Sequence, residues 1–197
     1  MSQSRDVAGS EGRSTNLLGA LAVAVGDRLR VATEDAARHT AAAPAALVAL
    51  HGFLAGGSMD DLRRVVGLTP SGAVRLVDRL EADGYVQRRP GANGRAVSLL
   101  LTANGHRAAR RVLAARSAAL DRVLGELSEA ERRAFERIAG KLLRTLAVDR
   151  LADRATGHPP PGGYLCRLCD FTACGRDRGA CPVTGLATTA GSKGAGT

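Results

Sequence analysis

The chain reads SMDDLRRVVGLTPSGAVRLVDRLEADGYVQRR between residues 58 and 89, and this stretch decides the fold. Ser58 can cap a helix, and Asp61 follows three residues later, which resembles a capping box with Asp in place of Glu. Gly67 supplies the sharp turn after that helix, where a Cβ would be an obstruction. A first short helix is therefore expected between Ser58 and Gly67.

A second helix is expected directly after this turn. Thr69 is its N-cap and Pro70 its first residue, because the first helical position leaves an N–H without an intrahelical partner and Pro has none to lose. The helix is expected to run to about Asp83, where Gly84 stops it. Two short helices joined by a tight turn that contains glycine form a helix-turn-helix.

A two-stranded hairpin follows the second helix. One strand is expected at 85–89 and the return strand at 95–102, with a turn rich in Pro, Gly and Asn at 90–94. A hairpin directly behind a helix-turn-helix is a wing. The expected fold class is therefore mainly α with a small β-wing.

Longer helices are expected on both sides of this unit. Apolar spacing predicts helices from about residue 16, at about 43–54 and at about 103–126. The last helix begins with a capping box from Ser128 to Glu131. One of its faces is apolar and carries Phe135, Ile138, Leu142 and Leu146. Helices this long at the end of a small domain usually need a partner, so a winged helix-turn-helix domain with long dimerisation helices is expected.

The chain divides by composition into five segments. Residues 1–13 are polar and are expected to be a disordered tail, and 14–150 form the winged helix-turn-helix and dimerisation domain. Residues 151–163 include three consecutive prolines and are expected to be a stiff linker. Residues 164–184 form a Cys-rich, metal-binding segment, and 185–197 are expected to be a second disordered tail.

Composition limits the function classes. Aromatic residues make up only 3% of the chain, so the core must be built from Leu, Val and Ala, which suits helix packing. The formal net charge of +9 favours a polyanionic partner, although a coding bias toward Arg on solvated helix faces would give the same charge. No apolar run approaches the roughly 20 residues that cross a bilayer, and the polar start lacks the apolar stretch of a secretory signal. We therefore expect a cytoplasmic protein without a membrane partner.

The N-terminal part of the second helix is the expected DNA-reading element. The residues on it that packing does not need are Ser71, Gly72, Arg75 and Arg79. Arg75 can donate two parallel hydrogen bonds to guanine, Ser71 can contact a base edge or phosphate, and Arg79 suits the DNA backbone. The alternative is that Arg75 pairs with Asp78, and Arg79 with Asp83, as ordinary surface charges.

The wing carries three further arginines. Arg95 is expected at the hairpin tip, where a basic side chain can enter the minor groove and narrow A·T tracts concentrate negative potential. Arg88 and Arg89 on the first strand can bind phosphates. The alternative is that all three simply keep a sheet edge soluble.

Three stretches together resemble the multiple-antibiotic-resistance regulator (MarR) family. They are LTPSGAVRLVDRLEADGYVQRR at 68–89, GRAVSLLLTANG at 94–105 and LSEAERRAFERIAGKLLRTL at 127–146. The combination is specific, although no single piece is. By order of elements the resemblance extends over residues 16–150.

The resemblance implies a homodimer joined through its first and last helices, palindromic operators in double-stranded DNA, and repression that a small ligand or oxidant usually relieves. It also implies an Asp-Arg-Arg sequence in the wing. The matching positions here are Asn93, Gly94 and Arg95, so only the final Arg is kept.

All four cysteines lie in one short segment with the spacing Cys166-x2-Cys169-x4-Cys174-x6-Cys181. Two cysteines separated by two residues direct both sulfurs at one ion, and two more a short loop away can complete a tetrahedron. The segment has almost no apolar core of its own, so a metal would supply the missing folding energy. Structural zinc is the first interpretation of this pattern.

Two other interpretations of the cysteines stay open. One is an iron–sulfur cluster, because Pro182 directly after the last cysteine is typical of cluster-binding segments, although the spacings differ. The other is a set of free thiols that oxidise to disulfides as a sensor, since Arg167, Arg176 and Arg178 favour thiolates. The cluster is not part of the MarR pattern, so the resemblance assigns it no role.

The function expected from these features is sequence-specific DNA binding by a homodimeric transcription regulator, a repressor that responds to a small ligand or to metal or redox state at the cysteines. No Ser-His-Asp, paired-carboxylate or glycine-rich phosphate arrangement stands out, which argues against an enzyme. The alternative is a protein-interaction module in which the winged domain and the cysteine knuckle dock a partner.

Overall fold

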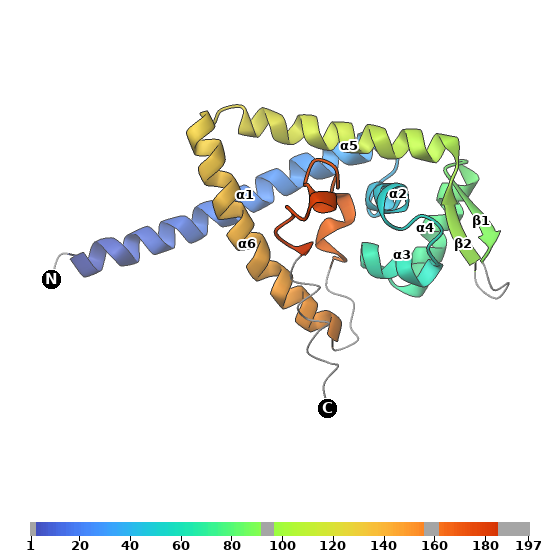
Figure 1. The fold of residues 1–197 in the computed structure, drawn as a ribbon, viewed down its shortest axis with the longest axis horizontal. Coiled ribbons are helices and arrows are strands. Elements are labelled where there is room, and N and C mark those ends of the chain that lie inside the picture. The colour runs from blue at the N-terminus through green and yellow to red at the C-terminus, as the bar shows by residue number, and fades with distance from the viewer. Residues whose placement is uncertain (1–2, 92–96, 156–161, 185–197) are drawn as a thin grey trace.

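A computed structural model describes residues 3–91, 97–155 and 162–184 (Figure 1). Its elements along the chain are α1 (Gln3–Ala37), α2 (Ala43–Gly52), α3 (Met59–Val66), α4 (Pro70–Ala82), β1 (Val86–Pro90), β2 (Val97–Leu101), α5 (Ala103–Leu124), α6 (Glu129–Ala155), and the short 3-10 helices η1 (Leu165–Leu168) and η2 (Arg176–Arg178). The expected fold class is confirmed, because the described chain is mainly helical with one small antiparallel sheet.

The helix α5 connects two parts of the molecule. In Figure 1 it spans the top of the view, with α2, α3, α4 and the hairpin at one end and the corner to α6 at the other. The C-terminal half of α1 packs along α5, and Arg111 Nε of α5 donates to the carbonyl of Ala36 over 3.3 Å. We call the compact part formed by α2–α4 and the hairpin the reading head.

The hairpin pairs β1 and β2 in a register that places Val86 opposite Leu101 and Pro90 opposite Val97. β1 is shifted by one residue from the expected 85–89, and β2 ends at Leu101, one residue earlier than expected. The segment before α3 adds to the sheet on the other side of β2, since Gly56 N donates to Leu99 O over 3.1 Å and Leu99 N donates to Gly57 O over 3.0 Å. The wing is thereby tied to the start of the helix-turn-helix.

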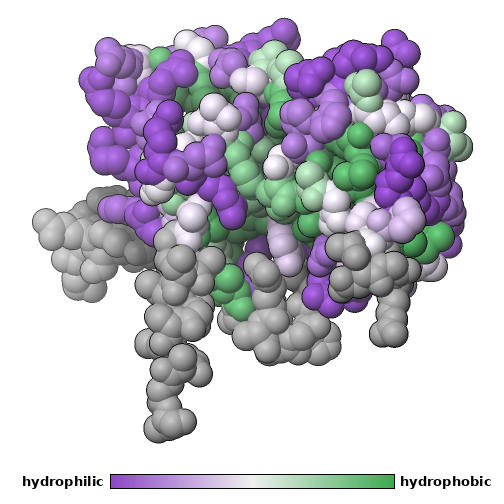
Figure 2. Space-filling view, turned by 45° about the vertical axis from the view of Figure 1, so that its right-hand side comes forward, coloured by the Kyte–Doolittle hydropathy of each residue, from purple (hydrophilic) through white to green (hydrophobic). Residues whose placement is uncertain are grey.

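The core lies inside the reading head and continues to the N-terminal half of α5. Its largest fully buried side chains are Leu47, Leu50, Leu62, Leu76, Leu80, Leu99, Val77, Val86 and Val112. Aliphatic residues fill it, as the low aromatic content predicts. On the face seen in Figure 2, hydrophobic side chains gather near the centre and hydrophilic ones lie along the upper and outer edges.

Two helix ends differ from expectation. The backbone of α1 begins at Gln3, so residues 3–13 are helical and not a disordered tail, and α6 continues to Ala155, into the segment expected to be a linker. Once a helix is nucleated, each added residue gains a hydrogen bond, so a polar extension without proline can form at little cost. The expected tail at 185–197 lies outside the described residues. None of the described helices combines the length and apolarity needed to cross a membrane.

Candidate nucleic-acid interface

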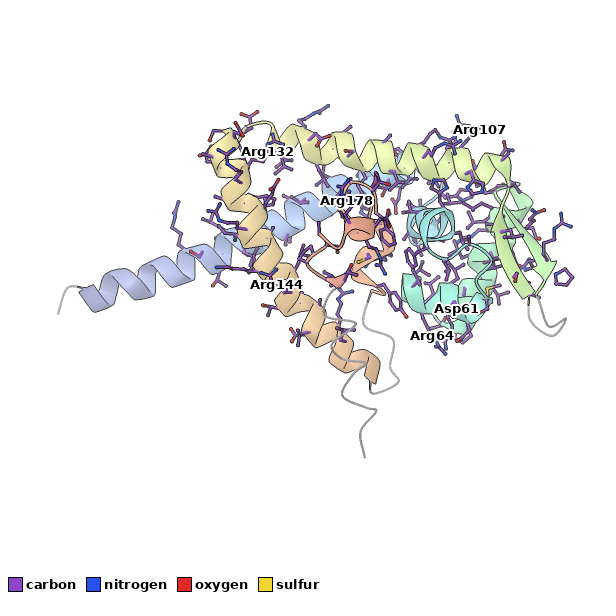
Figure 3. All side chains as sticks on the ribbon, in the orientation of Figure 1. Asp61, Arg64, Arg107, Arg132, Arg144 and Arg178 are labelled. Atoms are coloured by element: carbon purple, nitrogen blue, oxygen red, sulfur yellow. The ribbon has the colours of Figure 1, made fainter. Side chains whose placement is uncertain are left out.

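The turn between α3 and α4 is built by the local signals that the sequence predicts. Ser58 Oγ accepts from Asp61 N over 3.1 Å, and Asp61 Oδ2 accepts from Ser58 N over 3.1 Å, which completes the capping box. Figure 3 shows the labelled Asp61 and Arg64 on α3. Hydrogen bonds from the side chain and backbone of Ser58 lower the pKa of Asp61. Gly67 ends α3 at φ 71°, in the left-handed region that favours glycine.

Helix α4 starts at the expected cap. Thr69 Oγ1 accepts from Gly72 N over 3.1 Å, and Pro70 occupies the first turn. The helix buries Ala73, Leu76, Val77 and Leu80 against the reading head. Because these residues fix one face, the opposite face of α4 is presented to solvent.

The exposed face of α4 carries the predicted reading residues. Ser71, Arg75 and Arg79 are exposed, and Gly72 is half-buried beneath the Thr69 cap. The ion pairs that were the alternative for these arginines are absent from the described residues: Asp78 pairs with Arg88, and Asp83 pairs with His39 at 3.0 Å. Within residues 3–91, 97–155 and 162–184, neither Arg75 nor Arg79 forms an ion pair.

Arg88 lies on β1 as expected, but its side chain is engaged by carboxylates of α4. Its Nη2 lies 2.6 Å from Asp78 Oδ1, and its other terminal nitrogen pairs with Glu81. Glu81 Oε1 also accepts from Arg88 N over 3.2 Å. The hydrogen bond to Asp78, which has the largest effect, and the one to Glu81 raise the pKa of Arg88. Arg88 therefore joins β1 to α4 with its charge balanced by two carboxylates, and its contact with phosphate stays a prediction.

Of the two remaining wing arginines, one lies within the described residues. Arg89 is exposed, and its Nη2 donates to Gln87 Oε1 over 3.1 Å, so its guanidinium keeps donors for a phosphate. Arg95, with Asn93 and Gly94, lies outside the described residues.

Sequence reasoning missed a histidine pair between the reading head and α5. His51 Nδ1 and His106 Nδ1 are 2.8 Å apart, with the rings at 66° to each other. Burial, followed by the charges of His106 and Arg110, lowers the pKa of His51. Two histidines 55 residues apart give no local signal.

This pair predicts a pH effect on stability. The folded-state pKa of His51 lies below its ordinary value, so the unfolded chain binds the proton more tightly, and the stability linked to His51 is present above the ordinary pKa and lost as pH falls through the folded one. We expect the free energy of unfolding of the wild type to fall more than that of His51→Gln between about pH 7.5 and about pH 5.5. Urea unfolding at both pH values measures this, and equal losses in the two proteins would contradict it.

The cysteine segment (residues 162–184) is packed against the reading head. The rings of Phe53 and Phe171 stack at 5.1 Å, and Tyr164 N donates to Val65 O, at the end of α3, over 2.8 Å. All four cysteines are half-buried and form no disulfide. The part of the chain with a described structure gathers no group of three or more His, Cys, Asp or Glu side chains closely enough for a metal ion.

The thiols of Cys166 and Cys169 influence each other's ionisation. The interaction with Cys169 lowers the pKa of the Cys166 thiol to about 6, and the interaction with Cys166 raises the pKa of Cys169. Cys174 Sγ donates to the carbonyl of Phe171 over 3.4 Å. The sequence prediction of a metal at these residues stays a prediction.

The fold and the exposed face of α4 together define a winged helix-turn-helix transcription regulator. A family model described as the MarR family matches residues 40–96, and the chain belongs to this family. Members of the family are transcription regulators and not enzymes.

Individual relatives agree with this family. The chain is 34% identical over 87 residues to the transcriptional repressor MprA of Escherichia coli strain K12, and the match covers 44% of this chain and 49% of that protein. The match thus spans about half the length of the curated relative.

Solved structures match over a longer part of the chain. The YusO protein of Bacillus subtilis has a TM-score of 0.59 and 25% identity, over 70% of this chain and 96% of that one. The Mycobacterium tuberculosis MarR family protein Rv2887, in complex with DNA, has a TM-score of 0.51 and 32% identity, over 64% of this chain and 96% of that one.

Proposed function

We propose that this protein is a homodimeric repressor that binds a palindromic site in double-stranded DNA. Each protomer inserts α4 into the major groove, with Ser71 and Arg75 toward the bases and Arg79 and Arg89 toward phosphates. Its DNA affinity responds to a small ligand or to the chemistry of the cysteine segment. The repressor role follows MprA, and the DNA partner follows the complex of Rv2887.

The observation that carries the proposal is the state of the arginines on α4. An arginine already held by a carboxylate gives up that partner when it binds a phosphate or a base, which lowers the net gain. Asp78 pairs with Arg88 and Asp83 pairs with His39, so neither carboxylate holds an arginine of α4. Arg75 and Arg79 therefore keep their hydrogen-bond donors and their charge for a ligand. A guanidinium presents a planar fork of donors that matches the acceptor edge of guanine and the phosphate group.

Apolar rows on the long helices support the dimer. On α6, Ile138 is 57% exposed and Leu142 is 43% exposed, and on α1 Leu17 is 53% exposed. Contiguous apolar surface of this kind on a water-exposed helix usually marks an interface. A groove of about 530 Å³ between α1 and α5 is lined by four alanines and Val31 together with the charged Asp27, Arg28 and Arg122, and its small residues leave room for a helix from a second copy. The two-fold axis would then set the distance between the two α4 helices.

Charges placed in the apolar row of α6 are expected to separate the protomers. In Ile138→Asp/Leu142→Asp the new carboxylates would lie in a desolvated interface, whereas the isolated protomer already exposes both positions. We expect light scattering to show half the wild-type molecular mass at micromolar concentration. Val97→Asp is the matched control, because Val97 is 46% exposed but lies on β2, away from the long helices. An unchanged mass in the double variant would contradict this dimer.

The experiment that tests the function uses the full-length protein and a duplex selected from a random-sequence pool. We expect a footprint with two-fold symmetry and centres one or two helical turns apart. We also expect affinity to fall about a thousand-fold between 50 and 200 mM salt if six or more phosphates are contacted. Failure to select any duplex, or binding insensitive to salt, would overturn the proposal and favour a protein-docking module.

A further inference from the structure

We propose that Val74 is a specificity-determining residue of α4, and that its side chain packs against the C5-methyl group of a thymine next to the guanine bound by Arg75. This contact rests on the proposed function, because it adds a second base to the site that α4 recognises. Three features of α4 support it: the exposure of Val74, its position beside Ser71 and Arg75, and the small residues of the first helical turn.

Val74 is the one large apolar side chain that α4 exposes. The helix is described along its full length, Pro70–Ala82, and Leu76, Val77 and Leu80 are buried on its inner face. Val74, by contrast, is 44% exposed. Single exposed valines are ordinary on protein surfaces, so exposure alone assigns no role to this residue. Its role follows from the place on the helix at which it lies.

Val74 lies beside the two residues proposed to meet the bases. Residues three and four apart are neighbours on the surface of an α-helix, so Ser71 lies one turn before both Val74 and Arg75. All three residues are exposed in the N-terminal half of α4, where they form one patch. The patch combines a hydroxyl, a branched apolar group and a guanidinium. In the major groove a guanidinium matches guanine, and an apolar group matches the methyl group of thymine.

The small residues before Val74 allow the helix to come close to DNA. A valine side chain is short, so it reaches a base only where the helix backbone lies near the base edges. Gly72 has no side chain and Ser71 has a small one, which permits this approach. A Cβ on Gly72 would also lie 3.1 Å from Thr69 Oγ1, the atom that caps the helix. Valine has one strongly preferred χ1 rotamer in a helix, so it loses little conformational entropy when it packs against a methyl group.

The acidic residue on this side of α4 does not oppose the approach of DNA. Asp78 follows Val74 by four residues and Arg75 by three, so it shares their face, where a free carboxylate would repel phosphates. Arg88 Nη2 lies 2.6 Å from Asp78 Oδ1 and balances its charge. Within the described residues Arg75 and Arg79 form no ion pair. A duplex that contacts Val74 therefore also meets two guanidinium groups that no carboxylate holds.

The test removes the methyl group from the DNA and leaves the rest of the duplex unchanged. In the duplex selected with the full-length protein, each thymine of the two half-sites is replaced in turn by deoxyuridine, which pairs as thymine does but lacks the C5-methyl group. We expect one position in each half-site, next to the guanine that Arg75 requires, at which the replacement lowers wild-type affinity. The expected loss is about four-fold for one half-site, the contribution of one buried methyl group, and about fifteen-fold for both.

The Val74→Ala variant identifies the side chain that meets the methyl group. We expect this variant to bind the thymine duplex about as weakly as the wild type binds the deoxyuridine duplex. We also expect it to bind the two duplexes with nearly equal affinity, because the contact is already lost on the protein side. Val148→Ala is the matched control: it makes the same replacement at an exposed valine of α6, outside the apolar row of that helix. This control should keep both the affinity and the methyl dependence of the wild type.

Two results would overturn the role of Val74 and leave the proposed function intact. One is a selected duplex in which no thymine of either half-site is sensitive to deoxyuridine. The other is a Val74→Ala variant that remains as sensitive to the replacement as the wild type, which would assign the methyl contact to another side chain. If no duplex is selected at all, the proposed function is overturned and the role of Val74 with it.

Discussion

Replacement of Arg75 by Ala is expected to lower affinity for the operator about 10- to 100-fold, because a bidentate arginine–guanine contact contributes about 1–3 kcal/mol of discrimination. The loss should be accompanied by relaxed preference at one position in each half-site. Arg79→Ala is expected to weaken binding to all sequences alike and to reduce the salt dependence, as loss of a phosphate contact does. Anisotropy titrations against duplexes changed at single positions distinguish the two patterns.

Arg133→Ala is the matched control for these variants. It removes the same charge, but Arg133 lies on α6, paired with Glu129 and distant from α4. Its operator affinity should stay close to that of the wild type. If Arg133→Ala and Arg75→Ala weakened binding equally, net charge alone would explain the binding, and the assignment of Arg75 would be wrong.

Leu80→Ala is expected to destabilise the protein by about 2–5 kcal/mol, because it removes a buried side chain and leaves a cavity between α4 and the rest of the reading head. Leu80 has no exposed surface, whereas Val74 on the same helix is 44% exposed, so Val74→Ala serves as the control. Urea unfolding at one fixed protein concentration measures both, since dimerisation makes apparent stability depend on concentration. Similar losses in the two variants would contradict the packing described for α4.

The helix-turn-helix could be predicted from the sequence because its signals are local. The capping box of Ser58 with Asp61, the left-handed Gly67 and the Thr69 cap each act over two to four residues, and each appears in the structure at the expected place. Apolar spacing along α4 likewise predicts which of its faces is buried, because this spacing is also a local property of the sequence. The exposed positions of Ser71, Arg75 and Arg79 are a consequence of these local rules.

Contacts between distant segments could not be predicted. Nothing near Arg88 shows that it meets Asp78 and Glu81, although two acidic residues three apart on one helix are a weak signal for a basic partner. The stacking of Phe171 on Phe53 joins the cysteine segment to the end of α2, far apart in the chain, and a single sequence does not indicate it. The spacing of the cysteines suggested a shared ligand but not that their segment lies against Gly67.

The most direct measurement of the central claim, that the N-terminal half of α4 meets the DNA, is amide hydrogen exchange of the full-length protein with and without the selected duplex. The account predicts that DNA slows exchange in peptides that cover residues 68–80 and leaves the outer surface of α6 unchanged at constant dimer concentration. Unchanged exchange at 68–80 in a saturated complex, with protection on another surface, would contradict it.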